Sequence, residues 1–168
     1  YAFKASGFWQ DERESNMLDG AAHFYDSYEC ADNKFLDVGS IEPQFYSVLV
    51  EKLEISDPKF QDKMNRDKWK EIKAVMQETI KQKTRDEWAD IFDGTDACVA
   101  PILSLSEAPE HHHMKARKSF VEIDGVIQPA PAPRFSDTTT EIQHSSVKAG
   151  QNNDEICEKF DLDRSYFS

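Results

Sequence analysis

The chain has 168 residues and a net charge of −12, and 39% of its residues are hydrophobic, including 11 Phe and 3 Trp. This is enough apolar surface for one ordinary domain, or a small domain with an appendage, to bury a core. So acidic a surface repels phosphate backbones, which argues against nucleic-acid binding and against a phosphate pocket in this stretch. No run approaches the roughly 18 apolar residues of a membrane span, so we expect none.

The cysteines and histidines offer little chemistry. Cys30, Cys98 and Cys157 are far apart and contain no CxxC pair, which predicts free thiols in a reducing compartment. Cys98 could serve as a nucleophile, but it lies in an apolar run where we expect a buried structural thiol. Residues 111–113 (HHH) would point about 100° apart on a helix, so we expect an exposed polar turn and no metal site.

The first half of the chain predicts a β-hairpin followed by three helices. Strand-like runs at residues 24–30 and 35–39 form the hairpin. A helix opens at Pro43, with Phe45, Val48, Leu49 and Leu53 as its apolar stripe. The second helix spans residues 67–81 and buries Trp69, Ile72, Met76 and Ile80. A capping box at Thr84 and Glu87 starts the third, which Gly94 ends.

The second half predicts smaller elements. Residues 97–103 form a strand at an edge, because Pro101 interrupts it. A helix is expected over residues 106–117, and a second hairpin turns at Asp124-Gly125. A Pro-rich stretch, a mobile polar linker over 136–152 and a last helix over 153–160 follow.

Three motifs resemble the α-methylacyl-CoA racemase family. In order along the chain they are NMLDGAA (16–22), VGSIEPQFY (38–46) and IFDGTDACV (91–99), and the resemblance covers about residues 7–135. It implies the small α+β domain of the class III CoA-transferase fold, with β-hairpins and three to four helices. The expected organisation is a linker over 1–23 from a large domain absent here, the small domain over 24–128, a linker over 129–152, and a C-terminal helix over 153–168 that returns to the large domain.

The resemblance also implies an activity and a site. The family inverts the α-carbon of 2-methyl-branched acyl-CoA thioesters by proton transfer between a His and an Asp, and neither His23 nor Asp19 matches those bases. The chain is therefore expected to be inactive alone. Glu42 matches a carboxylate that lies close to the catalytic His, whereas the positions of Leu18, Tyr25 and Ile41 are expected to line the acyl path.

Local sequence alone favours a simpler role for Glu42, that of an acid complementing the helix dipole. Asn33 replaces the usual Gly of the hairpin turn, a tolerable change because Asn also adopts positive φ. The resemblance further implies an acyl-CoA substrate, no separate cofactor, an interlocked homodimer, and a peroxisomal or mitochondrial location, although residues 166–168 (YFS) are no Ser-Lys-Leu type signal. Two alternatives stay open: part of a class III CoA-transferase, or a non-catalytic interaction module.

Overall fold

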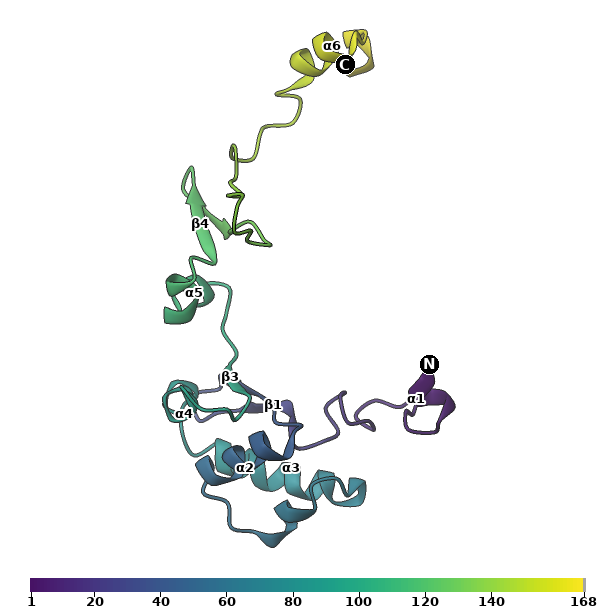
Figure 1. The fold of residues 1–168 in the computed structure, drawn as a ribbon, viewed down its shortest axis with the longest axis vertical. Coiled ribbons are helices and arrows are strands. Elements are labelled where there is room, and N and C mark those ends of the chain that lie inside the picture. The colour runs from purple at the N-terminus through teal and green to yellow at the C-terminus, as the bar shows by residue number, and fades with distance from the viewer. Residues whose placement is uncertain (168) are drawn as a thin grey trace. The chain divides into compact units, whose positions relative to one another are not determined.

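The computed structural model describes residues 1–167. The chain divides into two units, Tyr1–Ile102 and Leu103–Ser168, each of which has its own secondary structure. Figure 1 traces the elements in chain order. Both units contain helices and an antiparallel sheet, which confirms the predicted α+β class.

The sheet of the first unit has three antiparallel strands. They are β1 (Tyr25–Glu29), β2 (Phe35–Gly39) and β3 (Val99–Pro101), in the order β1-β2-β3. The first two form the predicted hairpin, and Asn33 in its turn has φ +58°. Since β3 is an edge strand, Pro101 at its end removes no donor that a further strand needs.

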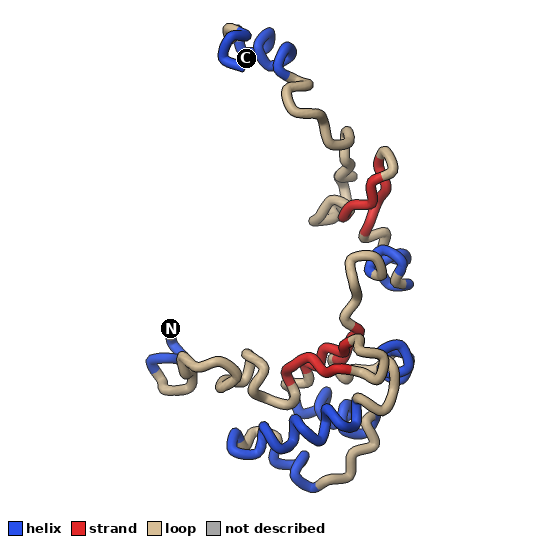
Figure 2. Tube along the Cα trace, turned by 180° about the vertical axis from the view of Figure 1, so that it is seen from behind, coloured by secondary structure: helices blue, strands red, loops and turns tan. Residues whose placement is uncertain are grey.

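Helices cover one face of this sheet. Figures 1 and 2 both show α2 and α3 beneath the strands. The helical elements of the unit are α1 (Ala2–Ala5), α2 (Pro43–Lys52), the 3-10 helix η1 (Pro58–Asp62), α3 (Arg66–Ile80) and α4 (Arg85–Phe92). α3 buries the four predicted side chains, each worth about 1.5–3 kcal/mol in transfer from water.

The buried face of α2 differs from the predicted stripe. Tyr46 and Leu49 are buried, and so is Leu53 just after the helix, whereas Phe45 is only half-buried. The stripe is rotated because the hydroxyl of Tyr46 has a buried partner, the imidazole of His23. A tyrosine with such a partner occupies the interior at little polar cost.

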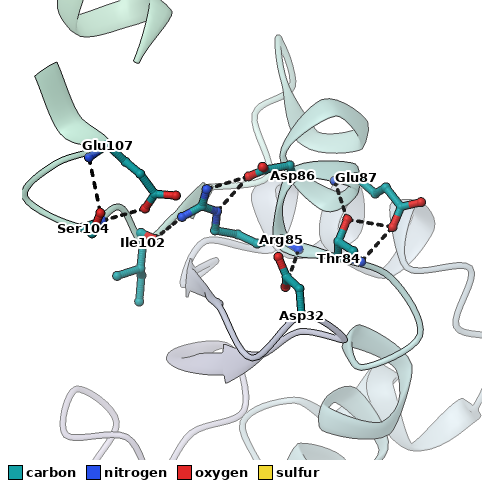
Figure 3. Close-up of polar contacts among 8 residues, drawn as sticks. All are labelled: Asp32, Thr84, Arg85, Asp86, Glu87, Ile102, Ser104 and Glu107. Carbon is teal, nitrogen blue, oxygen red and sulfur yellow. Dashed lines mark hydrogen bonds and ion pairs between the residues drawn. The ribbon is translucent and has the colours of Figure 1, made fainter. Parts of the chain in front are cut away.

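The start of α4 is held by the predicted capping box and by a buried arginine (Figure 3). Thr84 Oγ1 accepts from the Glu87 amide, and Glu87 Oε2 accepts from the Thr84 amide. The Arg85 side chain is 5% exposed; its guanidinium donates to Asp86 and, at 3.0 Å, to the carbonyl oxygen of Ile102. The carboxylate of Asp32, in the β1–β2 turn, accepts from the amide of Arg85. One residue thus ties α4, the hairpin turn and the residue after β3.

The second unit contains a two-stranded sheet and short helices. They are η2 (Ala108–Glu110), α5 (His112–Ala116), β4 (Phe120–Ile123), β5 (Val126–Pro129), α6 (Asn153–Phe160) and η3 (Arg164–Phe167). The hairpin and the last helix are confirmed. The single helix expected over 106–117 is wrong, because Pro109 donates no hydrogen bond and His111 is extended, with ψ 134°.

Candidate functional site

The segment that joins β2 to α2 is the candidate site, and its backbone is fixed by the loop before β3. The Gly39 amide donates to the carbonyl of Cys98 at 2.9 Å. The hydroxyl of Ser40, which is fully buried, donates to the carbonyl of Ala97 at 2.5 Å. Ile41, partly buried against the core, turns back through a 2.9 Å bond from its amide to the Gly39 carbonyl. These bonds set the direction in which the next residue leaves the sheet.

Glu42 is the N-cap residue of α2, and its side chain is exposed. Its carbonyl accepts the amide of Tyr46 at 3.0 Å, but its carboxylate caps no amide of the helix. Pro43 follows at the first helical position, where the lack of an N–H costs nothing. The carboxylate is therefore presented to solvent and left available for a group outside the chain.

The ammonium of Lys63 lies on the inner side of this segment. Its Nζ donates to the carbonyl oxygen of Ile41 and stands 5.0 Å from the ring centre of Phe24 and 4.7 Å from that of Tyr46. Burial lowers the pKa of this ammonium, and the carboxylate of Glu42 partly offsets that effect. No pattern in the sequence marks the place of Lys63, because it is one of many lysines and lies in a region of weak periodicity.

His23 is fully buried, so its imidazole is not accessible to a substrate. Its Nε2 lies 2.9 Å from the hydroxyl of Tyr46, and Tyr28 donates to its carbonyl. Burial, helped by the positive charge of Lys63, lowers the pKa of the imidazole to about 4. A neutral, enclosed imidazole is a core residue, as expected for a histidine that does not match the family's base.

The other two predicted acyl-path residues are exposed and lie on β1 and on the loop before it. Tyr25, 37% exposed, pairs across the hairpin with Gly39. Leu18 is 43% exposed on a loop that Lys73 ties to β1, since Nζ of Lys73 donates to the carbonyl of Gly20 and forms an ion pair with Asp26. The structure thus places Tyr25 beside the site segment and anchors the Leu18 loop to the same strand.

The carboxylate of Asp19 accepts hydrogen bonds from residues of that same loop. Although burial opposes the effect, hydrogen bonds from the Asn16 side chain and from the amides of Asn16, Ser15 and Ala21 lower the pKa of Asp19. The carboxylate makes a 2.7 Å bond with the amide nitrogen of the Asn16 side chain, which is buried. Asp19 therefore shapes the turn.

The prediction that Cys98 is buried is wrong. The thiol is exposed, and the residue has φ +53°, a left-handed conformation that turns its side chain out of the apolar run. Partial desolvation and the carboxylates of Glu42 and Asp96 raise its pKa, so it is not activated as a nucleophile. Over residues 1–167, no group of His, Cys, Asp and Glu could hold a metal ion, and no helix is long and apolar enough to cross a membrane.

Comparison with known proteins identifies the family to which this architecture belongs. The model of CoA-transferase family III matches residues 3–153. The chain belongs to CoA-transferase family III. The chain is also similar in structure to a solved CaiB/BaiF family protein from Brucella suis, with a TM-score of 0.66 and 20% sequence identity. The match covers 94% of this chain and 42% of that one, and it supports the fold.

Two curated relatives carry the name alpha-methylacyl-CoA racemase. The protein from Homo sapiens is 39% identical over 158 residues, which is 93% of this chain and 41% of the relative. The protein from Mus musculus is 43% identical over 127 residues, 76% of this chain and 33% of the relative. The chain thus spans about two-fifths of the length of the first relative and a third of the second.

Proposed function

We propose that the chain is the C-terminal portion of an α-methylacyl-CoA racemase, which inverts the α-carbon of 2-methyl-branched acyl-CoA thioesters by removing a proton from one face and returning one to the other. The observation that carries this is the 39–43% identity to two racemases over most of the chain. The motif around Glu42, VGSIEPQFY (38–46), resembles the same branch of the family.

This chemistry needs two bases on opposite faces of the α-carbon and donors for an enolate-like thioester oxygen. Neither buried His23 nor turn-forming Asp19 is suited to act as a base. We propose that the two bases lie in the part of the relatives that this chain does not span. No cofactor beyond the coenzyme A of the substrate is required by the reaction.

Within this chain, Glu42 is the residue proposed to support catalysis. Its exposed carboxylate, uninvolved in capping, is suited to face an imidazole from outside the chain. A carboxylate beside an imidazole favours the imidazolium and fixes the ring's orientation. Leu18, Tyr25 and Ile41 are proposed to line the acyl path, and the complete protein is proposed to be an interlocked homodimer of peroxisomes or mitochondria.

The test is exchange of the α-proton of a 2-methylacyl-CoA in deuterated water, followed by NMR. The full-length protein that carries this sequence is expected to catalyse exchange, and the 168-residue chain alone is not. Exchange by the chain alone would contradict the placement of the bases. Transfer of CoA between acids by the full-length protein, without exchange, would favour the alternative that the family name suggests, a CoA-transferase. The absence of both activities in the full-length protein would favour the third alternative, a non-catalytic interaction module.

A further inference from the structure

Lys63 is fixed in place from three directions. Its backbone carbonyl accepts the indole N–H of Trp69 on α3 at 2.6 Å, and Trp69 is itself buried. Its side chain passes the rings of Phe24 and Tyr46, with the ammonium 5.0 and 4.7 Å from their centres. At its end it donates to the carbonyl of Ile41. A long, flexible side chain is thereby held in one position.

The charge of this ammonium acts on the site segment. Half-buried among aromatic rings, it has little water to stabilise it, and the carboxylate whose field reaches it is that of Glu42. The other ionisable groups around it are His23, which is neutral, the phenol of Tyr46, and Asp57, which shares with it a groove of about 510 Å³ between α2 and η1. The ammonium of Lys63 thus lies at the carbonyl of Ile41, the residue directly before Glu42, and feels the charge of the Glu42 carboxylate.

We propose that Lys63 is a positioning residue of the acyl-CoA site, which fixes the Ile41 carbonyl and so the path from β2 into α2, and whose charge moderates that of Glu42. This rests on the proposed function, because Glu42 is assigned there to support an imidazole base. Lys63 itself contacts neither the substrate nor the base. It acts through Ile41, proposed to line the acyl path, and through Glu42, proposed to face the imidazole base.

The two charges have opposite effects on that base. Replacing Glu42 by Gln removes the negative charge that favours the imidazolium, so the pKa of the imidazole falls. Replacing Lys63 by Met leaves the carboxylate uncompensated, so the same pKa rises. A role in folding alone would lower activity without moving the pH–rate profile in this second direction.

The first test needs only the 168-residue chain and no activity. NMR of the lysine side chains, titrated with pH, gives the pKa of the Lys63 ammonium. Glu42→Gln is expected to lower that pKa, because the carboxylate raises it, and to leave the exposed Lys70 unchanged. An unchanged Lys63 titration overturns the proposal, whatever the reaction of the full-length protein proves to be.

The second test uses the full-length protein and three variants. Lys63→Met is expected to lower kcat about tenfold, as is typical of groups that orient others, with the His limb of the pH–rate profile moved upward. Lys63→Arg keeps the charge and should keep the profile, and Lys70→Met removes an exposed charge on α3 as a control. A Lys63→Met enzyme with kcat and pH–rate profile unchanged overturns the proposal.

If Lys63→Met does not fold, the Lys63→Arg variant decides. A displaced pH–rate profile in Lys63→Arg overturns the proposal, and an unchanged profile supports it. Absence of racemase activity in the wild-type full-length protein would instead refute the proposed function. The NMR titration would then decide on its own whether Lys63 is coupled to Glu42.

Discussion

The imidazole Nε2 of His23 and the hydroxyl of Tyr46 lie 2.9 Å apart, and His23 is fully buried. Three aromatic rings surround the imidazole edge-on, those of Phe24, Tyr46 and Phe60, at centroid distances of 5.1 to 5.8 Å. The second ring nitrogen, Nδ1, is buried without a hydrogen-bond partner among the described residues. An imidazolium at this place would be poorly solvated and repelled by Lys63, so folding selects the neutral ring.

Acid should therefore destabilise the chain through His23. The imidazole titrates near 6.5 when unfolded and at about 4 when folded, so between these values the unfolded chain binds more protons. The neutral imidazole of His23 makes its full contribution to the free energy of unfolding above pH 6.5. This contribution, roughly 3 kcal/mol, is lost as the pH falls towards 4. Urea unfolding at pH 7 and 4.5 measures it. His23→Gln, which offers Tyr46 a polar partner, should flatten this pH dependence, whereas His144→Gln, at an exposed position, should not. An equal loss of unfolding free energy between pH 7 and 4.5 in the wild type and in His23→Gln would refute the account.

Replacement of Arg85 should be costly. Arg85→Met leaves the carbonyl of Ile102 without its charged donor and removes the contact with Asp86, for an expected loss of about 2–3 kcal/mol in the free energy of unfolding. Denaturant titration measures the loss. Asp86→Asn is the matched control, since Asp86 is exposed and its loss should cost less than about 1 kcal/mol. Equal effects of the two changes would show that the Arg85–Ile102 bond contributes nothing.

The turn of the first hairpin should tolerate glycine at position 33 and reject branched residues. Asn33 has φ +58°, which costs a residue with a branched side chain about 1–2 kcal/mol. Asn33→Gly should leave the thermal midpoint nearly unchanged, whereas Asn33→Val should lower it by several degrees. A Val variant as stable as wild type would mean that the turn rearranges at no cost.

Removing the charge of Glu42 should lower turnover without harming the fold. In the full-length protein, Glu42→Gln is expected to reduce kcat roughly ten- to a hundredfold and to shift the His limb of the pH–rate profile to lower pKa. The thermal midpoint should stay, because the carboxylate is exposed and caps no amide. Unchanged turnover and profile would reduce Glu42 to a helix-terminal acid.

Local patterns in the sequence predicted most of the regular elements. The four buried residues of α3 follow helical spacing, and Thr84 with Glu87 marks the start of α4. The turn residues Asp124 and Gly125, at φ +51° and +79°, mark the second hairpin. Each of these signals lies within a few residues of the structure it predicts, so no tertiary contact is needed to read it.

The errors arose where distant partners decide the local structure. The preference of α2 for burying Tyr46 depends on His23, 23 positions earlier. The exposure of Cys98 depends on a backbone that turns left-handed while its carbonyl holds Gly39 on β2. Lys63 reaches Ile41 across 22 positions and two elements. Such relationships have no period in the sequence and emerge only from packing.

The exposed thiol of Cys98 gives this chain a built-in attachment point for a spectroscopic reporter. Cys30 is buried and Cys157 is half-buried, so a Cys157→Ser chain should couple a maleimide dye or spin label at Cys98 alone. The coupling needs mildly alkaline conditions, because partial desolvation and the carboxylates of Glu42 and Asp96 raise the pKa of this thiol. The label would then sit near Glu42, whose charge acts on the Cys98 thiol, while Glu42 itself is kept. Arrival of another domain or of a thioester ligand at that carboxylate could be followed as a change in the mobility or emission of the probe.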